Sequence, residues 1–340
     1  MNILVCDDSL VARKQMSLVI PKGMARRILF AEHGQQALHA LERESIDLMF
    51  LDLTMPVMDG YQTLEQLRHL GVNCLVIVVS GDIQPAAQAR VLDLGALAFI
   101  KKPVDSGELE AVLQENGLLD RTYEDESTAI GSAAELIGSS QQTPQECLQE
   151  IANVAMGQAA DRLARLLGVF IELPIPRLAA LSGGELAMTL DALTNGNHIA
   201  VCQGFVSRGL AAEALLSMDV SDAESLRKLM HQRNLSLGND DGAVLDAAIV
   251  LISAFLNGMG RILDTSFSKS QPALVSAETL VLPLWRAHKE LKDETLVIEV
   301  PYKFEEYNVS CDLLLLFPGP AAEAILENAS YLIDDEGAKI

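Results

Sequence analysis

The feature that most constrains the fold is an alternation of short apolar runs with amphipathic stretches over the first third of the chain. The apolar runs are rich in Val, Ile and Leu and almost uninterrupted, as in strands that are covered on both faces. They lie at 3–6, 27–30, 47–52, 74–80 and 97–100, and amphipathic stretches follow at 9–20, 34–44, 60–70, 84–94 and 105–116. Repeated βα units of this kind predict an α/β domain over residues 1–119, with a parallel sheet between helices.

Polar residues stand where these predicted strands end. Asp7 and Asp8 end the first strand, Asp52 the third and Ser80 the fourth, and Lys102 follows the fifth. The C-terminal ends of parallel strands share one edge, where such sheets place their sites. Three adjacent carboxylates repel one another, so protonation or a cation must relieve the repulsion. Oxygen ligands suit Mg²⁺, and the lysine and serine would complete a cradle for a phosphoryl group.

The segments that carry these residues are "CDDS", "LDLTMPVMDG", "VVSGD" and "KKP", in that order. With them, residues 1–117 resemble the response-regulator receiver domain, similar to CheY. The resemblance implies a flavodoxin-like (βα)5 fold in which Asp52 is the phosphoacceptor. It also implies Mg²⁺ bound by Asp7, Asp8 and Asp52, with the backbone carbonyl of Thr54 as a further ligand. Aspartate would attack a phosphodonor while Mg²⁺ neutralises the developing charge.

The same resemblance gives roles to residues near the fourth and fifth strands. Ser80 would contact the phosphoryl group and Lys102 would pair with it. Lys102 is chosen over Lys101 because the family's lysine directly precedes the proline, here Pro103, and we expect that peptide bond to be cis. Phe99 occupies the family's switch position, usually Tyr or His, and has no hydroxyl to donate.

Beyond the first domain, residues 120–143 are polar, acidic and Ser-rich. We interpret them as a linker with a short helix at 132–138, followed by a second domain over 144–340. Residues 150–179 align with 246–275 at an offset of 96, which indicates an internal repeat.

The repeat predicts an α+β domain with two long pseudo-symmetric helices on a sheet. We read "SGGEL" (182–186) as a tight turn and the tail after 317 as an extra C-terminal helix. The predicted strands are 186–191, 198–203, 279–284, 295–301 and 311–317.

The first long helix, beginning near Pro144, carries Glu150 and Asn153 on one face, three residues apart. Spacing alone is also typical of an ordinary solvated face. However, "EIANVAMGQAADRLARLLG" is similar to the E-x-x-N-x-x-x-G helix of the CheC, CheX and FliY phosphatases. The resemblance implies that Asn153 orients the water that attacks an aspartyl phosphate, since an amide can donate and accept at once. Glu150 would pair with the active-site lysine of the substrate receiver.

The second copy of this helix departs from the pattern. Asp246 stands in place of the glutamate and Ile249 in place of the asparagine. An alkyl group cannot orient water, so we predict a degenerate second site and at most one working site in this domain.

Charge and cysteine usage restrict the partners. Asp and Glu number 47 against 25 Lys and Arg, a net charge of −22, which opposes nucleic acid or an anionic membrane surface as a partner. The five cysteines are scattered, which favours reduced thiols in the cytoplasm. No apolar run reaches the roughly 18 residues of a membrane span, 247–260 coming nearest.

These expectations combine into a cytoplasmic two-component or chemotaxis protein. A histidine kinase or a small phosphodonor would phosphorylate the receiver at Asp52. The CheC-like domain would be a hydrolase acting on a phospho-CheY-like receiver, with action in trans preferred and action in cis left open, and with a CheD-like protein as a further partner. The alternatives are a catalytically silent scaffold switched by phosphorylation and a phosphate sink that drains a kinase.

Overall fold

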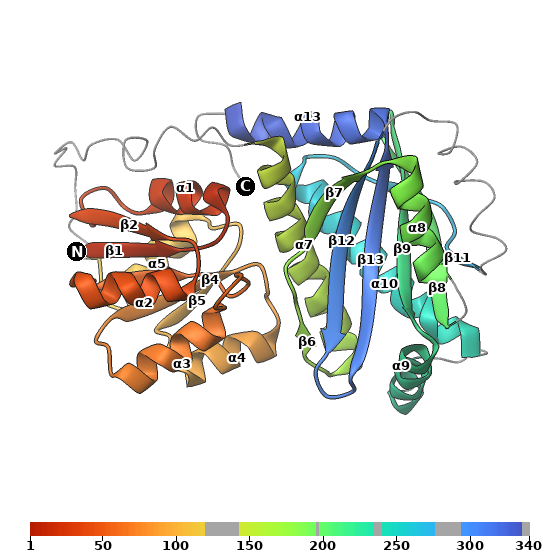
Figure 1. Ribbon diagram of the computed structural model, residues 1–340. Coiled ribbons are helices and arrows are strands. Elements are labelled where there is room, and N and C mark those ends of the chain that lie inside the picture. The colour runs from red at the N-terminus through yellow and green to blue at the C-terminus, as the bar shows by residue number, and fades with distance from the viewer. Residues whose placement is uncertain (120–142, 195–196, 234, 236–239, 276–293, 335–340) are drawn as a thin grey trace. The chain divides into compact units, whose positions relative to one another are not determined.

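The structure is a computed structural model that describes residues 1–119, 143–194, 197–233, 235, 240–275 and 294–334 (Figure 1). Its contacts divide the chain into two units, Met1–Glu150 and Ile151–Lys339. Three predictions lie outside the described residues: the linker up to residue 142, its helix at 132–138 and the strand at 279–284.

The first unit alternates strands and helices and contains one parallel sheet, ordered β2-β1-β3-β4-β5. This is the flavodoxin-like order, in which the chain reverses direction across the sheet between β1 and β3. The sequence prediction for this unit is therefore confirmed. Its elements are β1 (Asn2–Cys6), α1 (Leu10–Val19), β2 (Arg27–Ala31), α2 (Gly34–Arg43), β3 (Leu48–Leu51), α3 (Gly60–Leu70), β4 (Leu75–Ser80), α4 (Pro85–Asp93), β5 (Ala98–Lys101) and α5 (Ser106–Glu115).

The sheet of the first unit has a core on each face, and Figure 1 shows its helices distributed over both. Alternate residues of β1 supply the two cores: Leu4 packs with α2, α3 and α4, whereas Ile3 packs with α1 and α5. Burial on both sides explains why these strands are uninterrupted apolar runs.

A glycine fixes the approach of α3 to the end of β3. A Cβ on Gly60 would lie 2.3 Å from the carbonyl oxygen of Asp52 and 2.8 Å from Cα of Leu53. Only glycine permits this approach, and the preceding Asp59 begins α3 with a capping box to Gln62. The backbone around Asp52 is thereby held between strand and helix.

The second unit is built on a separate antiparallel sheet, as the α+β prediction required. The described strands run in the order β10-β8-β9-β13-β12-β6, with β11 paired to β8 and β7 to β12. Helix α7 (Pro144–Leu167) begins in the first unit and continues into the second. The remaining elements are β6 (Ile171–Glu172), β7 (Arg177–Leu181), α8 (Gly183–Thr194), β8 (His198–Ser207), β9 (Leu210–Asp219), α9 (Val220–Gln232), α10 (Asp240–Ile262), β10 (Ser268–Lys269), β11 (Ala273–Val275), β12 (Thr295–Phe304), β13 (Val309–Pro318) and α13 (Pro320–Asp334).

The predicted strand at 186–191 is wrong, because these residues lie inside helix α8. The predicted tight turn before it is also wrong: Ser182 and Glu185 form a capping box, in which each side chain bonds the other residue's backbone N–H. Leu186 and Leu190, one turn apart, then pack together on the sheet. A helical spacing of apolar residues was present and was misread as a strand.

The internal repeat extends through the strands. β9 and β13 are of equal length, share the same pattern of burial along the strand, and pair with each other. The short strands cross over: β6 and β7 pair with β12, and β10 and β11 pair with β8. α7 and α10 approach closely, since a Cβ on Gly258 would lie 3.0 Å from Cα of Ala155.

One described helix segment, Val244–Ile262 in α10, is long and apolar enough to cross a membrane by length and composition. It extends beyond the apolar run at 247–260. Leu251, Ile252 and Phe255 are fully buried in the structure, which is typical of a core helix.

Candidate phosphoryl-acceptor site

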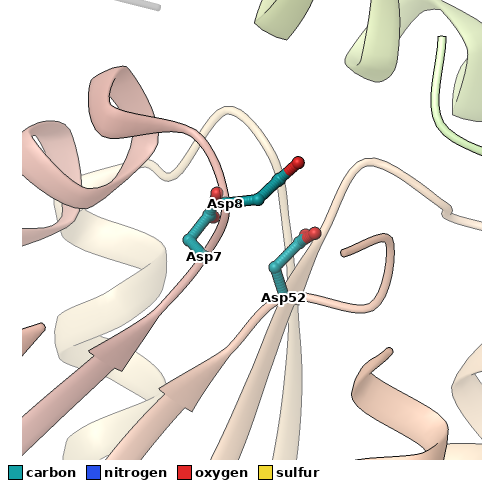
Figure 2. Close-up of side chains that lie close together, drawn as sticks. All are labelled: Asp7, Asp8 and Asp52. Carbon is teal, nitrogen blue, oxygen red and sulfur yellow. The ribbon is translucent and has the colours of Figure 1, made fainter. Parts of the chain in front are cut away.

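Three carboxylates meet beyond the C-terminal ends of β1 and β3. One oxygen from each of Asp7, Asp8 and Asp52 lies within 4.8 Å of the others. Figure 2 shows the three side chains above these two strand ends. Asp7 and Asp52 are buried and Asp8 is half-buried. The parallel sheet thus brings together the three aspartates that the sequence singled out.

Backbone groups and an arginine hold this arrangement. The backbone N–H of Ser9 donates to Oδ1 of Asp7 and that of Thr54 donates to Oδ2 of Asp52, each at 2.9 Å. Arg13 Nη1 donates to the carbonyl oxygens of Asp7 and Asp8 at 2.6 and 3.0 Å. Sequence reasoning missed Arg13, whose position one helical turn after the aspartate pair was the available signal.

Lys102 supplies the positive charge of the site. Its Nζ lies 2.8 Å from Oδ2 of Asp7 and 3.2 Å from Oδ1 of Asp52. The Lys102–Pro103 peptide is cis, as expected, and Lys101 is exposed while Lys102 is buried. The choice of Lys102 over its neighbour therefore agrees with the geometry.

Burial sets the protonation equilibria of the cluster. It raises the pKa of Asp7, Asp8 and Asp52 to about 7, with Lys102 opposing the shift in each case. Burial disfavours the charged form of Lys102 as well, yet the carboxylates of Asp52, Asp7 and Glu150 raise its pKa well above the usual value. The site consequently holds a permanent cation and acids that are costly to ionise without a further positive charge.

The residues fit a bound Mg²⁺ ion. Oδ1 of Asp52 is buried and, among the described residues, has no partner with hydrogen-bond geometry, although Nζ of Lys102 is 3.2 Å away. Carboxylate oxygens, completed by water and phosphate oxygens, are ligands that suit Mg²⁺. Asp7, Asp8 and Asp52 would hold the ion, and the Thr54 carbonyl remains a prediction from the resemblance.

Ser80 and Phe99 lie on neighbouring strands, β4 and β5. Ser80 is buried, and its hydroxyl accepts a hydrogen bond from the backbone of Asp82 at 3.1 Å. Phe99 is half-buried and packs on the core beneath α2, α3 and α4. Their phosphoryl-binding and switch roles stay predictions.

Glu150 is a further member of this site. Its carboxylate is 6% exposed and accepts a hydrogen bond from Nζ of Lys102 at 3.0 Å, and both residues belong to the first unit. We expected this glutamate to meet the active-site lysine of a substrate receiver, with a separate receiver preferred and the receiver of the same chain left open. The E-x-x-N motif pointed to Glu150, but nothing in the sequence named Lys102 as its partner.

The other predicted residues lie on the long helices of the second unit. Asn153 follows Glu150 by one turn of α7 and is half-buried. Asp246 and Ile249, the degenerate pair, are both exposed on α10. The position equivalent to Asn153 thus presents an alkyl side chain, and the degenerate second site stays a prediction.

A parallel sheet with three carboxylates, a serine and a lysine beyond its strand ends is the arrangement of a receiver-type signalling domain of the two-component and chemotaxis class. Residues 3–114 match the family model described as the response regulator receiver domain. By this match and its likeness to CheY, the chain belongs to the response regulator receiver family through its first unit.

Relatives extend over different shares of the chain. The chemotaxis protein CheY of Bacillus subtilis is 31% identical over 112 residues, covering 33% of this chain and 93% of CheY. The sensory/regulatory protein RpfC of Xanthomonas campestris pv. campestris is 27% identical over 227 residues, 56% of this chain. The chain spans 31% of the length of RpfC. Among solved structures, FliY of Thermotoga maritima is similar with a TM-score of 0.42 and 16% identity, covering 55% of this chain and 96% of that chain.

Proposed function

We propose that this protein is a phosphorylatable receiver joined to a CheC-like phosphatase that hydrolyses the aspartyl phosphate of a phospho-CheY-like receiver. A histidine kinase or a small phosphodonor would supply the phosphoryl group to Asp52. The observation that carries the proposal is the Lys102–Glu150 hydrogen bond, because it shows the helix glutamate engaging a receiver lysine.

The phosphoryl-accepting step uses the buried cluster. An oxygen of Asp52 attacks the phosphorus of the donor, the bond to the donor's leaving group breaks, and an acyl phosphate forms. Bound Mg²⁺ would neutralise the developing charge. Asp7 and Asp8 would hold the metal beside the acceptor carboxylate, and Lys102, which contacts both Asp7 and Asp52, can pair with a phosphoryl oxygen once the group has arrived.

The hydrolytic step would use the polar face of α7. Glu150 anchors the helix on the lysine of a receiver, and Asn153 on the same face orients a water molecule. The water oxygen bonds to phosphorus, the bond to the aspartate oxygen breaks, and phosphate leaves. An amide need not be basic for this task, because placement of the water supplies most of the rate.

A scaffold without catalytic activity is the second candidate. Ile249 stands at the position of Asn153 in the other half of the second unit, so this fold accommodates an alkyl side chain there, and this supports a role without catalysis. In that case phosphorylation of Asp52 would control binding to a partner, or would only drain a kinase.

The deciding measurement is phosphate release from phosphorylated B. subtilis CheY mixed with the full-length protein. We expect acceleration over spontaneous decay, its loss in Asn153→Ala and its retention in Asn257→Ala, a matched variant on the exposed face of α10. Asp52→Ala should keep this activity, whereas a phosphate sink would lose its effect. Absence of acceleration with the wild type would exclude the phosphatase for this substrate.

A further inference from the structure

Lys102 has three carboxylate partners, and one of them, Glu150, lies outside the aspartate cluster. Oxygens of Asp7, Glu150 and Asp52 lie 2.8, 3.0 and 3.2 Å from its Nζ. An ammonium group has three N–H donors. A phosphoryl oxygen that pairs with Lys102 must therefore compete with these carboxylates for its N–H donors.

The three carboxylates differ in how their departure from Lys102 would affect the site. Asp7 and Asp52 are fixed at strand ends and belong to the cluster that would hold the metal. Glu150 lies outside that cluster, on helix α7 and not at a strand end. It is the partner whose departure leaves the acceptor and the metal ligands in place.

The excess of negative charge in the site also points to Glu150 as the carboxylate that opposes phosphoryl transfer. Four carboxylates face one ammonium group in this site, and an incoming phosphodonor is itself an anion. Glu150 adds a negative charge 3.0 Å from the only lysine of the cluster. A unit charge at a few ångströms in a partly buried site alters a binding or rate constant by on the order of tenfold or more.

The beginning of α7 has a second neighbour in the first unit. Burial raises the pKa of the Cys147 thiol to about 11, and the ammonium group of Lys14 in α1 opposes that shift. Cys147 is buried and lies one turn before Glu150. The first turns of α7 thus lie within the electrostatic influence of a second cation of the first unit.

We propose that Glu150 is a positioning residue of the receiver itself, which occupies Lys102 in the unphosphorylated state and thereby slows phosphoryl transfer to Asp52. This inference goes beyond the phosphatase and does not need Asn153. It concerns how fast the receiver is loaded, whereas the phosphatase concerns how fast the phosphoryl group is lost.

The test measures initial rates of Asp52 phosphorylation by acetyl phosphate and Mg²⁺ in the full-length protein. All variants carry Asn153→Ala, so that hydrolysis by the proposed phosphatase does not distort the rates. In that background we expect Glu150→Ala to be loaded on the order of tenfold faster. Glu146→Ala, an exposed glutamate on the same turns of α7, should be loaded at the parent rate.

Two further variants separate charge and contact from folding. Glu150→Gln keeps the size and an acceptor oxygen but removes the charge, so it should be faster than the parent and still fold if alanine does not. Lys102→Met in combination with Glu150→Ala should abolish the gain, because the effect acts through the lysine. Beryllofluoride with Mg²⁺, a phosphoryl analogue, should bind Glu150→Gln more tightly by calorimetry.

Unchanged or slower loading of both Glu150 variants, or equal acceleration by Glu146→Ala, would overturn the proposal. The outcome does not depend on the phosphatase. If Asn153→Ala leaves hydrolysis unchanged while Glu150→Ala is loaded faster, the phosphatase proposal fails and this inference stands. If Asn153→Ala abolishes hydrolysis while Glu150→Ala is loaded at the parent rate, the phosphatase proposal stands and this inference fails.

Discussion

At the scale of single residues, the site of the first unit concentrates like charge in a buried place. Burial raises the pKa of Asp7, Asp8 and Asp52 from 3.8 to about 7. Without metal, the folded protein keeps protons that the unfolded chain has already lost between these pH values. Stability of the metal-free protein therefore falls as pH rises from about 4 to about 7.

Protons and Mg²⁺ should compete for this cluster. We expect the affinity for Mg²⁺ to rise by at least about tenfold between roughly pH 6 and roughly pH 8, because the carboxylates must lose protons to bind the ion. Calorimetric titration at these pH values measures it, and Asp8→Asn should lower the affinity at both. An affinity that does not change with pH would contradict the titration of the cluster.

Glu213 of β9 offers a test away from the site. Burial raises its pKa from 4.5 to about 7. Above about pH 7 the folded state must hold a charge that burial disfavours, so Glu213→Gln should stabilise the protein there by about 1–2 kcal/mol, allowing for partial exposure. Below about pH 4 the two proteins should be equally stable. Urea unfolding at pH 4 and 8 measures the difference, with the exposed Glu224→Gln as control; equal stability at pH 8 would refute it.

At the scale of elements, close approach between helices limits what α10 can carry. Gly258→Ala would place a methyl group 3.0 Å from Cα of Ala155, so we expect a loss of about 1–3 kcal/mol despite the better helix propensity of alanine. Gly184 in α8 has nothing within 4 Å of its Cβ position, and Gly184→Ala should stabilise by about 0.5–1 kcal/mol. Thermal unfolding of the pair checks both signs, and a stabilising Gly258→Ala would show that the helices can separate.

The first unit was predictable at the level of elements because its strands are buried on both faces and end in polar motifs. Each observed strand overlaps its predicted run to within a residue or two at either end. In the second unit, β9 was missed because "LAAEALLSMD" is rich in Ala, Leu and Glu, which favour helices. Pairing with β8 on one side and β13 on the other overrides that preference.

The candidate site was predictable to the extent that parallel topology gathers strand ends. Asp7, Asp8 and Asp52 lie together because the ends of two neighbouring strands, β1 and β3, meet at one edge of the sheet. The contact of Glu150 with Lys102 joins residues 48 positions apart in sequence across the segment 120–142, and no local pattern encodes it. Such a contact depends on where a helix comes to lie, which periodicity does not specify.

At the scale of the whole molecule, the net charge of −22 restricts the surfaces it can approach. We expect no saturable binding to duplex DNA at about 0.15 M salt, because an acidic protein gains nothing from releasing the counterions of a phosphate backbone. Fluorescence anisotropy with a labelled duplex measures this. Saturable binding that weakens as salt is added would reveal a basic patch that the overall charge conceals.

The crossing of the short strands in the second unit also has a consequence for how the chain can be divided. In the segment before the α9–α10 junction, the short strand β7 pairs with β12 of the later hairpin. In the segment after the junction, the short strand β11 pairs with β8 of the earlier hairpin. Either segment alone would leave an open sheet edge without the strand that covers it. If the two segments are produced as separate polypeptides, they should associate and restore the sheet by fragment complementation, as the subunits of a strand-swapped dimer do.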